Sequence, residues 1–147
     1  MVCPYCLSGQ TEVYNSRPTK KLGQLWRRRR CLVCKKEFTT YESVELEKVL
    51  KILDSTKKIK PFLKARLLLD VAKATEHRKD DAAYWLTESI QQQLLRLGAD
   101  NNGIITTYQI RRTCEAALKH FDTTAFIKYL AVHSPALLNA KSLKDQL

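Results

Sequence analysis

Two Cys-x-x-Cys pairs near the start of the chain restrict its fold more than any other feature. Cys3 and Cys6 form the first pair, and Cys31 and Cys34 form the second. This spacing lets two thiolates bind one tetrahedral ion from a single tight turn, so two pairs supply a complete set of four ligands. With sulfur at every position, no site remains for water or substrate. We therefore expect one structural Zn²⁺ ion held by these cysteines.

A Cys-x-x-Cys pair is also typical of a redox dithiol, and an iron site of the rubredoxin kind uses the same ligands. Two pairs that bracket strand-like segments favour zinc. The gap between the pairs is longer than in a usual zinc finger and suits a ribbon, in which a hairpin intervenes. The fifth cysteine, Cys114, lies in an apolar helical stripe, and we expect it to be a small core residue.

The segment around the cysteine pairs is rich in residues that favour strands. Runs rich in Val, Thr, Tyr, Trp and Phe occupy residues 11–16, 25–30 and 38–44, with turn signals at Ser8-Gly9, Pro18 and Leu22-Gly23. These runs predict three short strands. Few large apolar side chains accompany them, so the sheet has little core of its own and needs zinc to stabilise it.

Charge indicates the kind of partner. Lys and Arg number 26 against 15 Asp and Glu, and the net charge of +11 favours a polyanion such as nucleic acid, with an anionic membrane surface second. The densest basic run lies beside Trp26 and leads into the second cysteine pair. Alternation along a strand puts two of its arginines on each face, where they can bind phosphates or base edges. An ordinary solvated face is the alternative. The predicted DNA-binding residues are Arg17, Arg27, Arg28, Arg29 and Arg30.

The organisation changes between residues 45 and 60, where turn-rich sequence gives way to apolar repeats at helical spacing. We expect an α+β protein: a zinc ribbon over residues 1–45, a mostly helical domain over 46–136, and a polar tail over 137–147. The second domain opens with a predicted strand over 49–53 and a turn over 54–58.

Four helices are predicted after this turn. The first covers residues 62–75 with Pro61 at its start, the second runs from Asp80-Asp81 to a stop at Gly98, the third is capped by Thr106 or Thr107, and the last runs from Asp122 or Thr123 to Ser134-Pro135. Their apolar stripes include Leu63, Phe121 and Val132 among the positions expected to face the core.

Other features narrow the functional class. The longest apolar runs are far shorter than a membrane span, and no apolar signal segment follows Met1, so we expect a cytoplasmic, nucleoid-associated protein without a membrane partner. An enzyme is not expected, because the zinc site is closed and His77, His120 and His133 are scattered, with no evident pair of nucleophile and base.

Several motifs together resemble the NrdR family of bacterial repressors. They are Cys-Pro-Tyr-Cys at Cys3, Asn15-Ser16-Arg17, the arginine run entering Cys31-Leu32-Val33-Cys34, and Phe38-Thr39-Thr40-Tyr41-Glu42. Residues 46–136 resemble the ATP-cone domain of that family through Pro61-Phe62, the helix order and residues 125–132. The resemblance implies repression of ribonucleotide reductase genes, allosteric binding of ATP or dATP by the cone, and a homo-oligomer whose assembly controls binding to double-stranded operator DNA.

The start of the cone departs from the family pattern. The family has Val-x-Lys-Arg-x-Gly, whereas this chain has Val49-Leu50-Lys51-Ile52-Leu53-Asp54-Ser55, without the Arg or the Gly. The nucleotide-binding candidates are Val49, Lys51, Lys60 and Arg66, with Lys57 and Lys58 as further positive charge; ordinary surface charge is the other interpretation. The alternative function is a zinc-ribbon module that docks on RNA polymerase or nucleic acid, with the helical domain as a scaffold.

Overall fold

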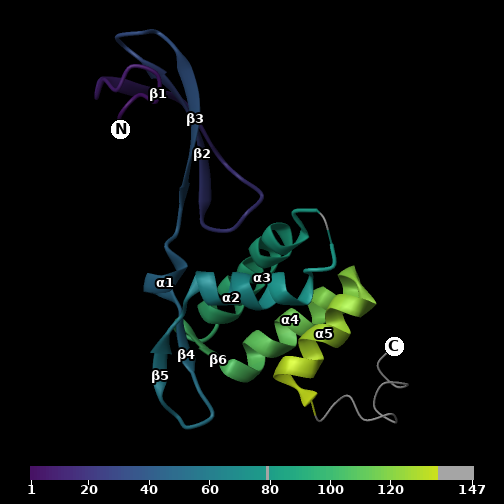
Figure 1. The fold of residues 1–147 in the computed structure, drawn as a ribbon. Helices are drawn as coiled ribbons and strands as arrows, with labels where there is room; N and C mark the ends of the chain where they lie inside the picture. Colours follow the sequence, from purple (N-terminus) through teal and green to yellow (C-terminus); the bar gives the residue numbers. More distant parts are fainter. Residues whose placement is uncertain (79, 136–147) are drawn as a thin grey trace. The chain divides into compact units, whose positions relative to one another are not determined.

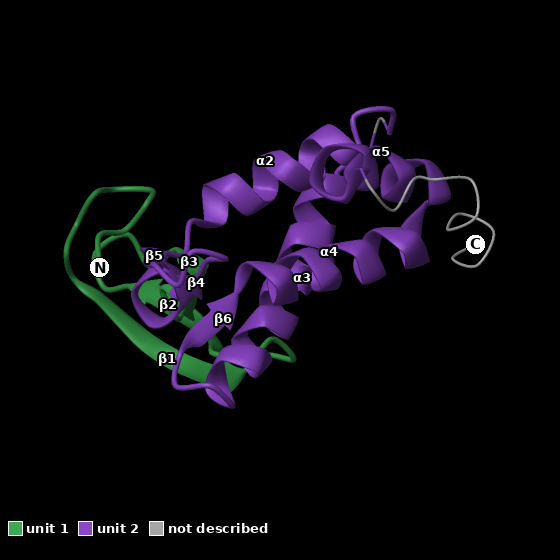
Figure 2. Ribbon diagram, turned by 90° about the horizontal axis from the view of Figure 1, so that it is seen from below, with its two compact units in different colours: residues 1–45 green, residues 46–147 purple. Residues whose placement is uncertain are grey.

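The computed structural model describes residues 1–78 and 80–135. The chain divides into two compact units, residues 1–45 and residues 46–147, which Figure 2 shows in different colours. The polar tail predicted over 137–147 lies outside the described residues. Among the residues that the structure describes, no helix is long and apolar enough to cross a lipid bilayer.

The unit of residues 1–45 contains one antiparallel sheet. Its strands are β1 (Thr11–Pro18), β2 (Gln24–Cys31) and β3 (Glu37–Ser43), with β2 in the centre (Figure 1). The three predicted strands are confirmed. β1 extends further than expected, because Pro18 is tolerated at the end of an edge strand, where no ladder N–H is needed. Phe38 is buried in a small cluster with Cys3 and Cys31, in keeping with the minimal core that was predicted.

The register between β2 and β3 assigns each arginine of the run to a face. The paired residues are Arg27↔Thr40, Arg28↔Thr39, Arg29↔Phe38 and Arg30↔Glu37. Cross-strand partners share a face of a sheet, so the predicted alternation of the arginines is present. We call the side with Arg28 and Arg30 the Arg28 face, and the side with Arg27, Arg29 and Phe38 the Phe38 face.

The unit of residues 46–147 combines a small sheet with helices. After α1 (Leu46–Val49), β4 (Lys51–Leu53) pairs antiparallel with β5 (Ile59–Pro61) and parallel with β6 (Ile104–Thr106). The long helices are α2 (Lys64–Ala74), α3 (Ala82–Ala99), α4 (Thr107–Phe121) and α5 (Thr123–His133). A three-stranded cysteine-bearing sheet followed by a mostly helical region confirms the predicted α+β class.

The four long helices pack in a ring, in which α2 and α4 each contact both α3 and α5 (Figure 1). Their apolar stripes form one core that includes Val71, Ile90, Leu118 and Leu130. Cys114 is fully buried in this core, as predicted, and burial raises the pKa of its thiol to about 11.

Two predicted helix starts are confirmed by their caps. Thr106 Oγ1 accepts the N–H of Gln109 at 3.1 Å, and the Gln109 side chain accepts the N–H of Thr106 at 2.7 Å, which completes a capping box before α4. At α5, Asp122 Oδ1 accepts the N–H of Ala125 at 2.9 Å.

Several boundaries differ from the predictions. Pro61 ends β5 instead of starting a helix, and α2 begins at Lys64. The fixed φ of proline also suits an edge strand, and β5 lies at the edge of its sheet. Val49 ends α1 and does not start a strand. β5 and β6 were not predicted.

Three apolar side chains predicted to face the core are exposed instead. Leu63, Phe121 and Val132 are 49%, 37% and 70% exposed. Leu63 lies just before α2, and Phe121 and Val132 lie at the ends of α4 and α5.

Two glycines allow a close approach between the start of this unit and α3. Gly98 does not stop α3, which continues to Ala99; a Cβ at Gly98 would lie 2.4 Å from Leu50 Cδ2. Gly103 has a φ of +79°, and a Cβ there would lie 2.5 Å from the carbonyl oxygen of Val49. The carbonyl of Gly103 accepts the N–H of Lys51 at 2.8 Å.

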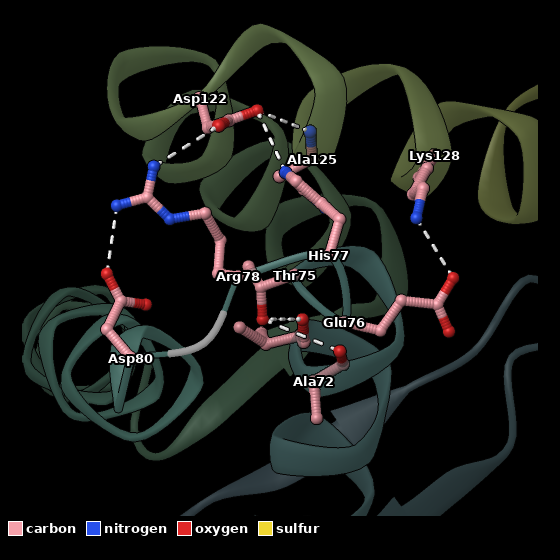
Figure 3. A network of polar contacts seen from close by, with 10 residues as sticks. Ala72, Thr75, Glu76, His77, Arg78, Asp80, Asp122, Ala125 and Lys128 are labelled. Atoms are coloured by element: carbon pink, nitrogen blue, oxygen red, sulfur yellow. Dashed lines mark hydrogen bonds and ion pairs between the residues drawn. The ribbon is translucent and has the colours of Figure 1, made fainter.

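A polar network joins the loop after α2 to the start of α5 (Figure 3). Asp122 pairs with His77 Nε2 at 3.4 Å and with Arg78 Nη1 at 3.8 Å, and Arg78 also pairs with Asp80 at 2.9 Å. The N–H of Ala125 and, to a smaller extent, His77 lower the pKa of Asp122. One carboxylate thus caps α5 and contacts two residues of the loop that follows α2.

Candidate metal centre and nucleic-acid interface

Both cysteine pairs lie in turns of the same backbone geometry. In each turn the first cysteine donates its N–H to the carbonyl five residues later, and its own carbonyl accepts an N–H from four residues later. These hydrogen bonds are Cys3 to Ser8 (2.8 Å), Leu7 to Cys3 (2.9 Å), Cys31 to Lys36 (3.0 Å) and Lys35 to Cys31 (3.1 Å). Leu7 and Lys35, each just after its pair, have positive φ values of 59° and 61°. The two turns therefore present their thiols in equivalent ways.

These turns bring the four cysteine sulfurs within 4.8 Å of one another. Sγ atoms are 3.7 Å apart between Cys3 and Cys34, and 3.6 Å apart between Cys6 and Cys31. Thiolates at about 2.3 Å from a tetrahedral zinc ion lie about 3.8 Å apart, whereas a disulfide joins sulfurs at about 2.05 Å. The spacing fits zinc and not a pair of disulfides. Within residues 1–78 and 80–135, no other group of this kind gathers.

The thiols differ in how readily they ionise. The N–H of Cys34 donates to Cys31 Sγ at 3.5 Å and, with the N–H of Val33, lowers the pKa of Cys31 to about 6. The N–H of Ser8 lowers the pKa of Cys6, but desolvation and contacts with the other three thiols outweigh it and raise that pKa to about 11. Four adjacent thiolates repel one another, so full ionisation needs a divalent cation as counter-charge. A bound zinc ion would supply this charge and join the two turns.

On the Arg28 face, one carboxylate contacts two guanidinium groups. Glu37 Oε1 accepts from Arg30 Nη2 at 2.9 Å, and Glu37 Oε2 pairs with Arg28 Nη2 at 3.3 Å. Tyr14 donates its hydroxyl to Glu37 Oε2 at 2.8 Å and accepts from Arg28 Nε at 3.3 Å. The hydrogen bonds from Arg30 and Tyr14 lower the pKa of Glu37 to about 2, so its side chain is a carboxylate at neutral pH.

The Phe38 face is arranged differently. Arg27 Nη2 pairs with Glu42 Oε2 at 2.7 Å, and Arg29 Nε donates to Thr40 Oγ1 at 3.1 Å. The buried Phe38 lies toward the cysteine end of this face, against Cys3 and Cys31. Part of the Phe38 face is therefore covered by the core of the ribbon.

Aromatic rings contact several of the basic groups. Arg17 lies over Trp26 at 5.0 Å, Arg30 over Tyr14 at 5.0 Å, and Lys36 over Tyr5 at 4.9 Å. Arg17 is also the β1 partner of Trp26, which shares the Arg28 face. Three of the five predicted DNA-binding arginines therefore lie on one surface: Arg17, Arg28 and Arg30.

The residues predicted to bind nucleotide lie around the β4–β5 hairpin and α2. Val49 is 44% exposed at the end of α1, and Arg66 is exposed on α2. Lys60 pairs with the residue next to Lys51, so these two lysines leave the hairpin on opposite faces. Lys60 Nζ also pairs with Asp54 at 2.7 Å. The structure does not bring Lys51 and Lys60 to the same side of the hairpin.

Sequence reasoning missed Glu37 and Tyr14. Tyr14 is the extra residue of a β-bulge, where the register shifts between Val13 and Asn15, and simple alternation cannot assign such a residue to a face. For Glu37 a signal was available. It is an acidic residue at the start of the strand that follows an arginine-rich strand, and opposite charges are favoured across a strand pair.

A four-cysteine site formed by two equivalent turns beside a three-stranded sheet defines a zinc-ribbon protein. Residues 1–42 match the N-terminal domain described as "Transcriptional repressor NrdR-like". The Transcriptional repressor NrdR of Deinococcus radiodurans is 33% identical over 135 residues, 90% of this chain and 82% of the relative. That of Sphingopyxis alaskensis is 34% identical over 90% of this chain and 84% of the relative, and that of Chlamydia muridarum 30% over 90% and 86%. The chain belongs to the NrdR family of transcriptional repressors, which implies DNA as a partner.

Proposed function

We propose that this protein represses ribonucleotide reductase genes by binding double-stranded operator DNA through its zinc ribbon. The observation that supports this most directly is the Arg28 face, where Arg17, Arg28 and Arg30 lie on one side of a sheet beside the metal centre. Arginine forks bind phosphates and guanine edges, and a metal-stabilised strand holds them in a fixed register. The protein acts in the cytoplasm, in association with the nucleoid.

The second half of the proposal is control by adenine nucleotides. ATP and dATP are the allosteric ligands of the helical unit, and the protein is a homo-oligomer whose assembly state sets operator affinity. A nucleotide changes DNA affinity only as far as it prefers one assembly over another. The proposed contacts are Val49, Lys51, Lys60 and Arg66. Phosphate would replace Asp54 as the partner of Lys60.

A second candidate is a zinc-ribbon module that docks on nucleic acid or RNA polymerase, with the helical unit as a scaffold that senses no nucleotide. Two observations favour it: Lys51 and Lys60 lie on opposite faces of their hairpin, and Lys60 is already paired with Asp54.

Binding of a labelled duplex distinguishes the two candidates. The duplex carries paired operator sites from a ribonucleotide reductase promoter, and the full-length, zinc-loaded chain is titrated without nucleotide, with ATP and with dATP. We expect operator affinity to differ about fivefold or more between nucleotide states, a usual size for allosteric coupling. Equal affinity in all three states supports the scaffold, and absence of duplex binding contradicts operator recognition.

Native mass spectrometry of the same samples tests the ligands directly. We expect one zinc per chain, retained nucleotide and a change in subunit number between ATP and dATP.

A further inference from the structure

The centre of the Arg28 face contains a negative charge, which is unexpected on a surface that binds a polyanion. Glu37 is ionised, and its side chain is 33% exposed, so it repels any phosphate that approaches Arg28 or Arg30. A surface that only attracted DNA electrostatically would bind it more tightly without this carboxylate.

The contacts of Glu37 extend across all three strands. Its two carboxylate oxygens contact Arg28 and Arg30 of β2 from β3, and Tyr14 of β1 completes the cluster. Tyr14 contacts the cluster twice, because its hydroxyl joins Glu37 to Arg28 and its ring lies 5.0 Å from the guanidinium carbon of Arg30. The β-bulge at Tyr14 belongs to this arrangement, since a bulge redirects a side chain.

We propose that Glu37 is a positioning residue for DNA recognition, which fixes Arg28 and Arg30 in the conformation that distinguishes the operator from other sequences. The inference depends on the proposed operator binding. In this role Glu37 decreases affinity for DNA in general and increases the preference for one sequence. The sequence-specific contact is then made by two guanidinium groups that are held in place beforehand, through the N–H donors that their contacts within the sheet leave over.

The chemistry of arginine supports a positioning role. A free arginine side chain loses much rotamer freedom when it binds, and holding it in place beforehand reduces that cost. Two guanidinium groups against one carboxylate leave the cluster positive. Arg30 uses Nε and Nη2 on Glu37, and its Nη1 donors lie outside these contacts, on a side chain that is 46% exposed.

Glu42 provides a matched comparison on the same strand. It has the same charge and also pairs with an arginine, but it contacts Arg27 on the Phe38 face and is 65% exposed. Replacing either glutamate by glutamine changes the net charge equally. Only the replacement at Glu37 removes the carboxylate that contacts two guanidinium groups of the Arg28 face.

The test measures the ratio of two affinities in the full-length protein at one salt concentration. The specific probe is the duplex that the wild-type chain enriches from a random-sequence pool, and the second probe is a scrambled duplex of the same composition. We expect Glu37→Gln to bind the scrambled duplex as well as or better than wild type, and to lose about tenfold in the ratio. Glu42→Gln should raise both affinities alike and keep the ratio within about twofold.

Tyr14→Phe tests positioning without a change of charge. It removes the hydroxyl that joins Glu37 to Arg28, and it should lower the ratio in the same direction by a smaller factor. Zinc content measured by mass spectrometry verifies that each variant keeps its ribbon.

The outcomes separate this inference from the proposed function. If Glu37→Gln and Glu42→Gln raise both affinities alike, Glu37 is only a counter-charge and the inference is wrong, while operator binding stands. If the wild-type chain enriches no sequence from the pool, the proposed function fails and the inference fails with it.

Discussion

At the scale of single residues, the backbone of each cysteine turn contains a position that favours glycine. Leu7 and Lys35 adopt φ values of 59° and 61°, in the left-handed region where an L side chain costs about 1–2 kcal/mol. Both turns tolerate the positive φ because the free energy of zinc binding is much larger than the free-energy cost of the backbone strain.

Lys35→Gly is expected to tighten zinc binding. Relief of strain exceeds the added entropy of glycine in the unfolded chain, which leaves a gain of about 0.5–1 kcal/mol. Because zinc binding is coupled to folding of the ribbon, this gain appears as about a twofold to fivefold higher zinc affinity in a chelator competition. Lys36→Gly, at a position without positive φ, is the control and should weaken zinc binding. A weaker affinity for Lys35→Gly would show that the turn is not strained.

A residue of the site could be predicted only where its own side-chain chemistry, without knowledge of its neighbours in space, indicates its role. The cysteine spacing and the arginine run were sufficient for the ligand candidates and for the alternation of the arginines. Tyr14 depends on a bulge, which neither residue type nor period shows. For Glu37 the acidic residue type after an arginine-rich strand was a signal, but its partners depend on the register of β2 and β3. Register is a property of two strands, so a single strand could not reveal it.

At the scale of elements, Asp122 makes the start of α5 sensitive to pH. Its pKa lies below the ordinary value of 3.8, first because of the N–H of Ala125 and then because of His77. A carboxyl whose pKa is lowered by folding stabilises the folded state fully above the unfolded pKa, and this stability is lost as the pH falls through the folded pKa.

Thermal unfolding of wild type and Asp122→Asn, followed by helical circular dichroism, tests this dependence. Asparagine can still cap α5 but carries no charge for His77 and Arg78. The melting temperature of wild type should exceed that of the variant at pH 7, and the difference should shrink below about pH 4. A difference that does not change with pH would assign the effect to shape and not to charge.

Gly103 determines how β4 and β6 meet. Gly103→Ala combines a φ of +79° with a Cβ placed 2.5 Å from the carbonyl oxygen of Val49. We expect a loss of about 1–3 kcal/mol in the free energy of unfolding of the helical unit, measured with denaturant. Gly9→Ala, where a Cβ would have no heavy atom within 4 Å, should leave stability nearly unchanged. Equal stability of Gly103→Ala and wild type would contradict the close approach.

Element predictions succeeded where a pattern was long enough to repeat. The four long helices follow from apolar spacing and cap residues. The sequence predicts Thr106 or Thr107 and Asp122 or Thr123 as caps, and the structure has Thr106 and Asp122. β5 and β6 have three residues each, too few for any period, and β6 pairs in parallel with a strand some 50 residues earlier in the chain. Pro61 was predicted to start a helix and Gly98 to stop one. Sequence alone shows neither that β5 is an edge strand nor that Gly98 lies close to Leu50.

At the scale of the whole molecule, the chain consists of two compact units that differ in what stabilises them. Residues 1–45 have a minimal core around two cysteines and Phe38, whereas the helical unit has an extensive apolar core. Zinc chelation is therefore expected to unfold residues 1–45 and to leave the helical circular dichroism and its melting transition largely intact. Loss of both signals together would mean that the units depend on each other for stability.

The central claim is that the Arg28 face binds operator DNA, and the salt dependence of binding tests it most directly. The slope of log affinity against log salt counts the phosphates that are neutralised, at about 0.9 per contact. Arg28→Ala combined with Arg30→Ala should reduce the magnitude of this slope by up to about 2. Lys73→Ala combined with Arg96→Ala removes the same charge from exposed positions of the helical unit and should leave the slope unchanged. An arginine variant whose slope and operator affinity both equal those of wild type would place the DNA contact elsewhere and contradict the account.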